Sequence, residues 1–148
     1  MQEKIRSGVW YGMFAVFVAM ISFFLLNMSH TLPENPVEPE TRSFAMIIFV
    51  SVFMAPVLEE IIFRFFPIGL TNRYTKNKGV LWLVILGASV LFGYLHGGFV
   101  HIFMQGVTGI FYSAAYLRGG LISSVVAHAT YNATLLLNIF AASFFVTM

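Results

Sequence analysis

The chain has no cysteine and no aspartate, and charged residues make up 9% of its 148 positions. Without cysteine there is no disulfide framework, no thiol nucleophile and no thiolate metal site. Without aspartate, an aspartyl intramembrane protease is excluded, because that chemistry uses two aspartates that share a proton. Soluble domains carry about 25% charged residues, so the low charge content argues against a water-soluble fold. The basic residues form no patch, and the net charge of +2 indicates no nucleic-acid partner.

Apolar residues dominate what is present: 59% of the chain is hydrophobic, 17% is aromatic, and the mean hydropathy is +0.85. This composition predicts an integral membrane protein, and the length allows one compact domain, residues 1–148. A membrane-spanning helix needs about 20 predominantly apolar residues. We expect such spans at residues 8–26, 43–70, 79–96, 99–117 and 121–146. The predicted fold is therefore all-α, a polytopic transmembrane helical bundle of about five spans.

Basic residues are divided unevenly between the loops on the two sides of these spans. One side carries six of them, and the other carries Arg42, in a proline-containing loop expected at residues 27–42. The six are Lys4, Arg6, Arg73, Lys76, Lys78 and Arg118. Because short cytoplasmic loops carry the excess of lysine and arginine, we expect the N-terminus in the cytoplasm and the C-terminus outside. The chain is predicted to be a multi-pass protein of the cell membrane, in contact with membrane lipid.

The second expected span contains three charged residues, Glu59, Glu60 and Arg64. A charge at the centre of a membrane helix costs roughly 2.5–3.5 kcal/mol, so these residues must serve packing or function. Glu60 and Arg64 are four residues apart and can form an ion pair, which fits a structural role at least as well as a catalytic one. Glu59 lies about 100° away around the helix, with no cation one turn away, which favours a functional role. Pro56 and Pro67 flank the group, and each can kink the helix and free backbone carbonyls.

Polar side chains also interrupt the later spans, at His96, His101, Gln105, His128 and Asn132. A lone membrane histidine usually packs or forms a hydrogen bond. Two histidines, an asparagine and an unpaired glutamate on three helices, however, are expected to converge on a polar cavity. There a glutamate and a histidine could activate water, while an imidazole and a carboxamide could donate to an oxyanion. This set predicts a peptide-bond hydrolase without a covalent intermediate. His101 and Gln105 could support the site, line its entrance or lie near the membrane interface.

Three short motifs follow one another inside the expected spans: Glu59-Glu60-x-x-x-Arg64, Phe92-x-x-x-His96 and His128-x-x-x-Asn132. The ordered trio resembles the motifs of the CPBP family of intramembrane proteases, also called the CAAX-protease and bacteriocin-processing family, which has an Rce1-like and an Abi branch. By this resemblance, Glu59 and His96 would activate the water. His128 and Asn132 would form the oxyanion hole.

The resemblance also implies roles for the supporting residues and for the partners. Glu60 and Arg64 would support the site, with Arg64 holding Glu60. The enzyme would be a glutamate-dependent endopeptidase that works without a metal or other cofactor. Its substrate would be a membrane-associated protein or peptide, which is prenylated in the best-known relatives. Because the chain is shorter than characterised members, a homo-oligomer could complete the walls of the substrate site.

Other functions fit parts of the same residue set. In a zinc protease, Glu59, His96 and His128 could supply three ligands, but there is no His-Glu-x-x-His stretch and Asn132 would have no role. In a rhomboid-type serine protease, Ser89 would pair with His128. The residue after Ser89 is not the glycine expected there, however, and a small residue inside a span usually serves helix packing. In a non-catalytic protein that binds or sequesters a membrane partner, the charged cluster would be structural.

The positions of the candidate residues along their spans set a geometric condition. Suppose the helices are straight and perpendicular to the membrane plane, with a rise of about 1.5 Å per residue. Measured from the cytoplasmic ends of their helices, His128 would then lie about 12 Å deep, Glu59 about 17 Å and His96 about 26 Å. Such helices would not bring His96 to His128. We therefore expect strong tilt, or a third span that begins earlier or breaks near Gly93.

Overall fold

The computed structural model describes residues 1–28 and 43–146, whose regular secondary structure is entirely helical. Helix α1 spans Gln2–Met28. The next segment is a continuous series of α-helical and π-helical pieces: α2 Phe44–Ile48, η1 Phe49–Met54, α3 Ala55–Glu60, η2 Ile61–Gly69 and α4 Leu70–Tyr74, where η marks a π-helix. The remaining elements are α5 Lys78–Leu95, α6 Phe99–His101, η3 Ile102–Gly106, α7 Val107–Gly119 and α8 Leu121–Val146. The predicted all-α fold is confirmed.

Within the described residues, three helical segments are long and apolar enough to cross a membrane: Gln2–Leu26, Phe44–Tyr74 and Lys78–Leu95. They correspond to the first three expected spans. The residues of the fourth, 99–117, also lie in a continuous series of helical pieces, α6, η3 and α7, which is not among the three. Helix α8 has 26 residues but carries His128 and Asn132, and it is not among the three.

The orientation of the chain in the membrane stays a prediction. Residues 29–42, which include Arg42 and most of the expected outer loop, lie outside the described residues. Asn27 and Met28, placed in that loop by the sequence, belong instead to the end of α1.

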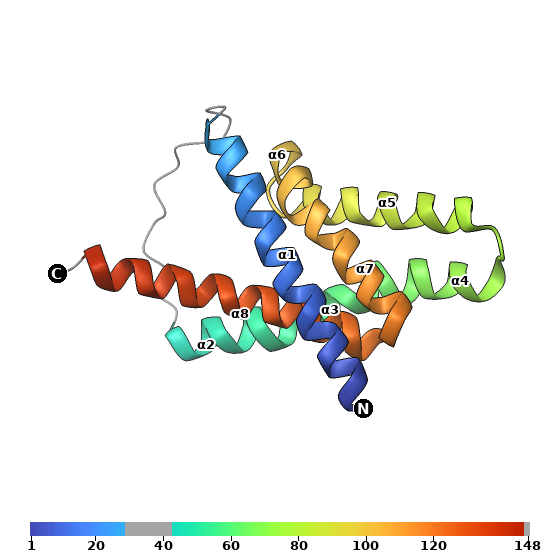
Figure 1. Cartoon of the computed structure of the whole chain (residues 1–148), viewed down its shortest axis with the longest axis horizontal. Coiled ribbons are helices and arrows are strands. Elements are labelled where there is room, and N and C mark those ends of the chain that lie inside the picture. The colour runs from blue at the N-terminus through green and yellow to red at the C-terminus, as the bar shows by residue number, and fades with distance from the viewer. Residues whose placement is uncertain (29–42, 147–148) are drawn as a thin grey trace.

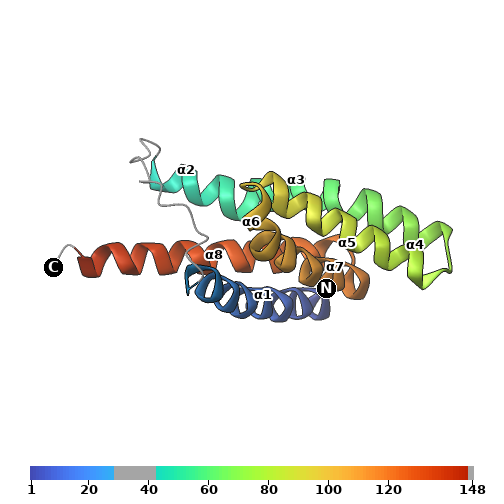
Figure 2. The same ribbon diagram turned by 90° about the horizontal axis from the view of Figure 1, so that it is seen from above.

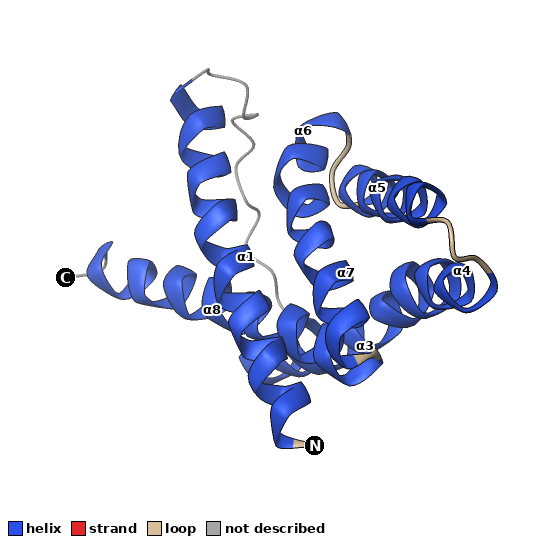
Figure 3. Cartoon of the chain, turned by 45° about the vertical axis from the view of Figure 1, so that its right-hand side comes forward, coloured by secondary structure: helices blue, strands red, loops and turns tan. Residues whose placement is uncertain are grey.

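The helices cross steeply. Helix α1 packs mainly against α7 and α8, while α5 packs against η2, η3 and α7. In Figure 1, α1 crosses α8 and α5 runs back beside α4, a pairing that Figure 2 shows again from above. Figure 3 shows α7 rising between α1 and the α4–α5 pair. The tilt of the helices relative to the membrane stays a prediction, and α5 continues without a break through Gly93.

Glycines permit the closest of these crossings. A Cβ on Gly8 would lie 2.6 Å from the carbonyl oxygen of Ser123, and a Cβ on Gly12 would lie 2.5 Å from that of Ala127. The two glycines are four residues apart, so both face α8. Gly93 is equally close to η3, where its Cβ would lie 2.7 Å from backbone atoms. Membrane helices approach closely where such small residues meet, because they have no hydrophobic drive toward one another in lipid.

The end of α5 is set by a glycine turn. Gly98 has φ +84°, in the left-handed region that side chains with a Cβ rarely adopt. The turn reverses the chain into α6 and leaves His96 as the C-terminal cap of α5. The histidine is thereby held at the tip of a helix, next to η3 and α7, rather than in the middle of a span.

The distribution of polarity is that of a membrane protein. The buried residues include the charged and polar side chains of Glu60, Arg64, Ser89, Thr108, Ser113, Ser123, Ser124 and His128. Large apolar side chains lie outside instead, and Trp10, Leu83 and Phe99 are each at least 70% exposed. Because an exposed apolar surface on this scale suits lipid rather than water, the exterior is the surface that contacts the bilayer.

Candidate active site

A cavity of about 320 Å³ lies between the 44–74 segment, α5, the η3–α7 segment and α8. Its polar lining consists of Ser51, Glu59, His96, Gln105, Thr108, Tyr112, His128, Tyr131 and Asn132. All four residues predicted to be catalytic from the sequence line this cavity. The two predicted supporting residues, Glu60 and Arg64, do not line it and are fully buried.

The carboxylate of Glu59 lies within reach of both imidazoles. Its Oε2 lies 3.7 Å from Nε2 of His96 and 3.7 Å from Nε2 of His128. The side chain as a whole is 27% exposed, yet Oε2 itself is buried and accepts no hydrogen bond from any described residue. Leaving a buried acceptor unsatisfied costs about 1–3 kcal/mol. A carboxylate oxygen held this way in a cavity is a candidate for chemistry rather than for packing.

Each imidazole is oriented through its Nδ1. His96 Nδ1 donates to the backbone carbonyl of Phe92 at 2.7 Å. Because a carbonyl accepts and does not donate, Nδ1 carries the proton, and Nε2 of the neutral ring presents a lone pair toward Glu59. His128 Nδ1 lies 2.9 Å from Oε1 of Glu60. The two histidines therefore present the same nitrogen, Nε2, to the same carboxylate oxygen.

Behind His128, Glu60 and Arg64 form the ion pair that their spacing predicts. Nη1 of Arg64 lies 3.0 Å from Oε1 of Glu60, and both side chains are 0% exposed. Nη2 donates to the carbonyl of Gly109 at 3.2 Å, and Tyr112 stacks on His128 with ring centroids 4.6 Å apart. Because Oε1 of Glu60 accepts from the guanidinium, we assign Nδ1 of His128 as the donor in their hydrogen bond. Nε2 of His128 then carries a proton when the ring is cationic.

Asn132 is held by a carbonyl that a proline leaves free. Its Nδ2 donates to the carbonyl oxygen of Ser51 at 2.7 Å. Ser51 belongs to the π-helix η1, where an N–H bonds five residues back, as that of Ala55 does to the carbonyl of Val50. The carbonyl of Ser51 would therefore receive the N–H of residue 56, but Pro56 has none. This geometry agrees with the prediction that a proline frees a carbonyl here, and Asn132 donates to that carbonyl.

The sequence-based prediction missed most of what α7 contributes. Thr108 and Tyr112 both line the cavity. The available signal was a polar stripe at three- and four-residue spacing, formed by Gln105, Thr108 and Tyr112 on one helix face. Gln105 also lines the cavity, and its Oε1 lies 2.9 Å from Nδ1 of His101, which does not line it. The stripe therefore identifies one complete wall of the site.

The zinc-protease and rhomboid-type alternatives each require particular residues at the site. Over residues 1–28 and 43–146, no group of three His, Cys, Asp or Glu side chains is placed to hold a metal ion. Ser89, the serine of the rhomboid-type alternative, does not line the cavity. Its buried Oγ lies 3.3 Å from where a Cβ on Gly109 would be, which is the packing role expected of it.

Comparison with protein families bears on the same residues. The family model for the type II CAAX prenyl endopeptidases, Rce1-like, matches residues 41–134. The chain belongs to this family. The match contains every candidate site residue of the Rce1-like chain and all of the polar lining of the cavity, and it ends within α8. Membership makes the chain a CAAX-type intramembrane protease in general terms. No curated protein and no solved structure matched the chain.

Proposed function

We propose that this Rce1-like chain is an endopeptidase that hydrolyses a peptide bond of a membrane-associated substrate with water activated by Glu59 and His96. The supporting observation is the position of Glu59 Oε2, 3.7 Å from Nε2 of His96 and of His128 and without a donor of its own. That separation is too long for a direct hydrogen bond and suits a shared water. A water that donates to Oε2 and to Nε2 of His96 keeps its oxygen lone pairs free for attack.

The proposed reaction has two steps and no covalent enzyme intermediate. First, the water oxygen forms a bond to the carbonyl carbon of the scissile peptide, the water proton passes to Glu59, and the carbonyl oxygen becomes an oxyanion. The oxyanion then collapses, the C–N bond breaks, and Glu59 returns its proton to the leaving nitrogen. The products are a carboxylic acid and an amine.

Asn132 and His128 stabilise the oxyanion in this proposal. One Nδ2 hydrogen of Asn132 binds the carbonyl of Ser51, which orients the amide and leaves the second hydrogen for the oxyanion. His128 donates from Nε2 as a cationic ring, while Glu60 accepts from its Nδ1. Arg64 holds Glu60 in the position that makes this possible. One such donor is typically worth about 10²–10³ in kcat.

The substrate follows from where the cavity lies. Its apolar lining includes Leu135, Leu136 and Ile139 of α8, and the bundle around it is covered by lipid-facing side chains. We propose a membrane protein or lipid-anchored peptide as substrate, cleaved close to its membrane attachment. The family's name makes a prenylated C-terminal peptide the first one to test. The proposed location is the cell membrane.

Cleavage of membrane-tethered peptides by the purified protein in lipid vesicles tests the proposal. The panel contains prenylated and non-prenylated versions of each peptide. Glu59→Gln and His96→Ala should each lower kcat by about 10²–10⁴-fold. Glu3→Gln, which neutralises an exposed carboxylate of α1, should cleave at the wild-type rate. A strong chelator should leave wild-type cleavage unchanged.

Three outcomes would replace the proposal. Loss of cleavage with the chelator, restored by zinc, would make Glu59, His96 and His128 metal ligands instead. Full activity of Glu59→Gln would show that Glu59 is not the general base. If the folded wild type cleaves nothing in the panel and the cellular phenotype survives Glu59→Gln, a binding or sequestering role is supported.

A further inference from the structure

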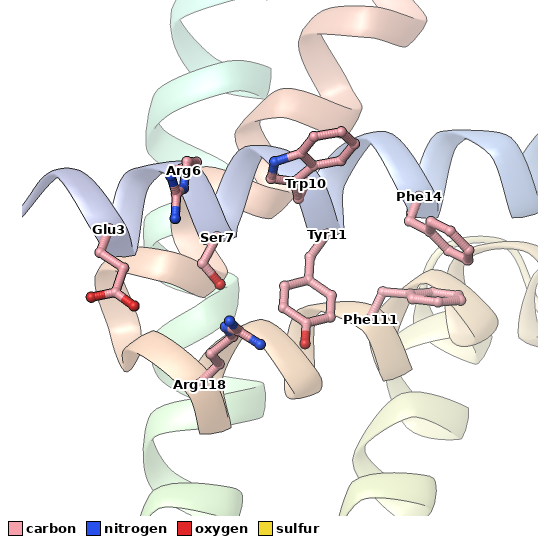
Figure 4. Close-up of a pocket in the computed structure, with 8 residues that line it drawn as sticks. All are labelled: Glu3, Arg6, Ser7, Trp10, Tyr11, Phe14, Phe111 and Arg118. Carbon is pink, nitrogen blue, oxygen red and sulfur yellow. The ribbon is translucent and has the colours of Figure 1, made fainter.

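A second groove lies between the N-terminal half of α1 and α7, with a volume of about 770 Å³. It shares no lining residue with the candidate active site. Its lining consists of Glu3, Arg6, Ser7, Trp10, Tyr11, Phe14, Phe111 and Arg118, shown in Figure 4. The proposed peptidase reaction uses none of these residues.

The groove changes character along its length. At one end, the guanidinium groups of Arg6 and Arg118 come from the two facing helices (Figure 4). At the other end, Phe14 of α1 packs against Phe111 of α7, with ring centroids 5.6 Å apart. The two remaining aromatic side chains lie between these ends (Figure 4). The groove is therefore cationic at one end and aromatic along the rest.

The cationic end has unused hydrogen-bond donors. Among the described residues, no carboxylate lies within ion-pair distance of Arg6 or Arg118, although Glu3 lies on the same rim. The Oγ of Ser7 is buried there and has no hydrogen-bond partner in the described part of the chain. Two guanidinium groups and a hydroxyl on facing helices can together donate to one phosphate group, because arginine binds phosphate through paired N–H groups.

We infer that this groove binds an anionic phospholipid of the surrounding membrane. Its phosphate lies between Arg6 and Arg118, and an acyl chain lies along the aromatic half of the groove. A bilayer offers a phosphate and an acyl chain in this order along a helix that enters it. Helix α1 is a candidate membrane span from Gln2, so its first turns would lie among the lipid headgroups. Trp10, which is 71% exposed, is the kind of residue that anchors a helix at that depth. A free phosphate would occupy the cationic end alone and leave the aromatic half without a ligand.

Fluorescence quenching by brominated lipid tests the inference at the groove itself. The chain has two tryptophans, so Trp82→Phe leaves Trp10 as the reporter. The protein is reconstituted in phosphatidylcholine vesicles that contain increasing fractions of dibrominated phosphatidylglycerol, or of dibrominated phosphatidylcholine as the neutral counterpart. We expect the anionic lipid to quench Trp10 at a lower mole fraction. Each arginine removed should weaken that preference about fivefold, the effect of one basic residue at a membrane surface.

Five variants separate the effect of charge from an effect on the fold. Arg6→Gln/Arg118→Gln should abolish the preference, and each single change should remove part of it. The matched pair Arg6→Lys/Arg118→Lys, which keeps both charges, should retain most of it. Arg73→Gln removes an exposed arginine at the end of α4, outside the groove, and should change nothing. Circular dichroism in neutral detergent checks that every variant keeps its helices.

The opposite results would overturn the inference. Equal quenching by the two brominated lipids would mean that the groove has no preference for an anionic headgroup. A preference that survives the loss of both arginines would place the recognition elsewhere. Displacement of the lipid by millimolar inorganic phosphate would make the site an anion site rather than a lipid site. The readout is binding, so it is independent of the proposed peptidase activity.

Discussion

Replacement of Arg64 by methionine tests the ion pair behind the candidate active site. Arg64 and Glu60 are both 0% exposed, and their charged atoms lie 3.0 Å apart. Without the guanidinium, the buried carboxylate of Glu60 keeps Nδ1 of His128 as its donor. Breaking a buried pair from one side costs about 3–5 kcal/mol. The free energy of unfolding of Arg64→Met should fall by this amount, more than about a hundredfold in the ratio of folded to unfolded protein.

The double variant Glu60→Gln/Arg64→Met removes the unpaired charge as well. Glutamine keeps an oxygen that can accept from Nδ1 of His128, and methionine adapts to the space left by the arginine. Because replacing both members of a buried pair is often neutral or stabilising, most of the lost stability should return. Arg73→Met, the same change at an exposed position, should alter the free energy of unfolding by less than about 0.5 kcal/mol.

The measurement is the loss of far-ultraviolet circular dichroism as SDS is added to the protein in neutral detergent micelles. Two results would refute the reasoning. If Arg64→Met unfolded at the wild-type SDS fraction, the guanidinium would contribute no net stability. If the double variant were as unstable as Arg64→Met, the loss would come from packing around the arginine rather than from an uncompensated charge.

Two further substitutions probe how the site is held. Gly109→Ala would place a Cβ 2.8 Å from Nη2 of Arg64 and should lower the free energy of unfolding by about 1–3 kcal/mol. Gly87→Ala is the control, because a Cβ there would have no atom within 4 Å, and it should be neutral or stabilising in the same SDS titration. Asn132→Leu strands the carbonyl of Ser51 and should cost about 1–3 kcal/mol. An unchanged unfolding midpoint in Gly109→Ala, or in Asn132→Leu, would show that the contact in question does not stabilise the bundle.

Several features of the site were predictable because they depend on spacing along one helix. The four-residue spacing of Glu60 and Arg64 makes them neighbours on any α-helix, and the pair is found as predicted. Glu59 points away from that pair for the same reason. The proline effect at Pro56 is also local, since the missing N–H is a property of the residue itself. What could not be predicted was that Asn132, far along the chain, would take up the freed carbonyl.

The fourth expected span shows where local patterns stop being sufficient. Residues 99–117 are apolar enough to suggest one regular span, and they lie in a continuous helical run, but its second piece, η3, is a π-helix. This π-helical turn packs closely against Gly93 of α5, which is a contact between two elements. Hydropathy averages over a window and does not register such a contact.

By itself the sequence determined the membrane class, the helical content, the first three candidate spans and the ion pair beside Glu59. Each follows from composition or from the helical repeat, which act over a few residues. The tertiary structure decided that Nε2 of His96 and Nε2 of His128 both lie 3.7 Å from Glu59. Those distances depend on crossing angles, which small residues such as Gly8, Gly12 and Gly93 make possible through contacts with other helices. A helical repeat specifies which residues share a face, but packing between helices decides which faces meet.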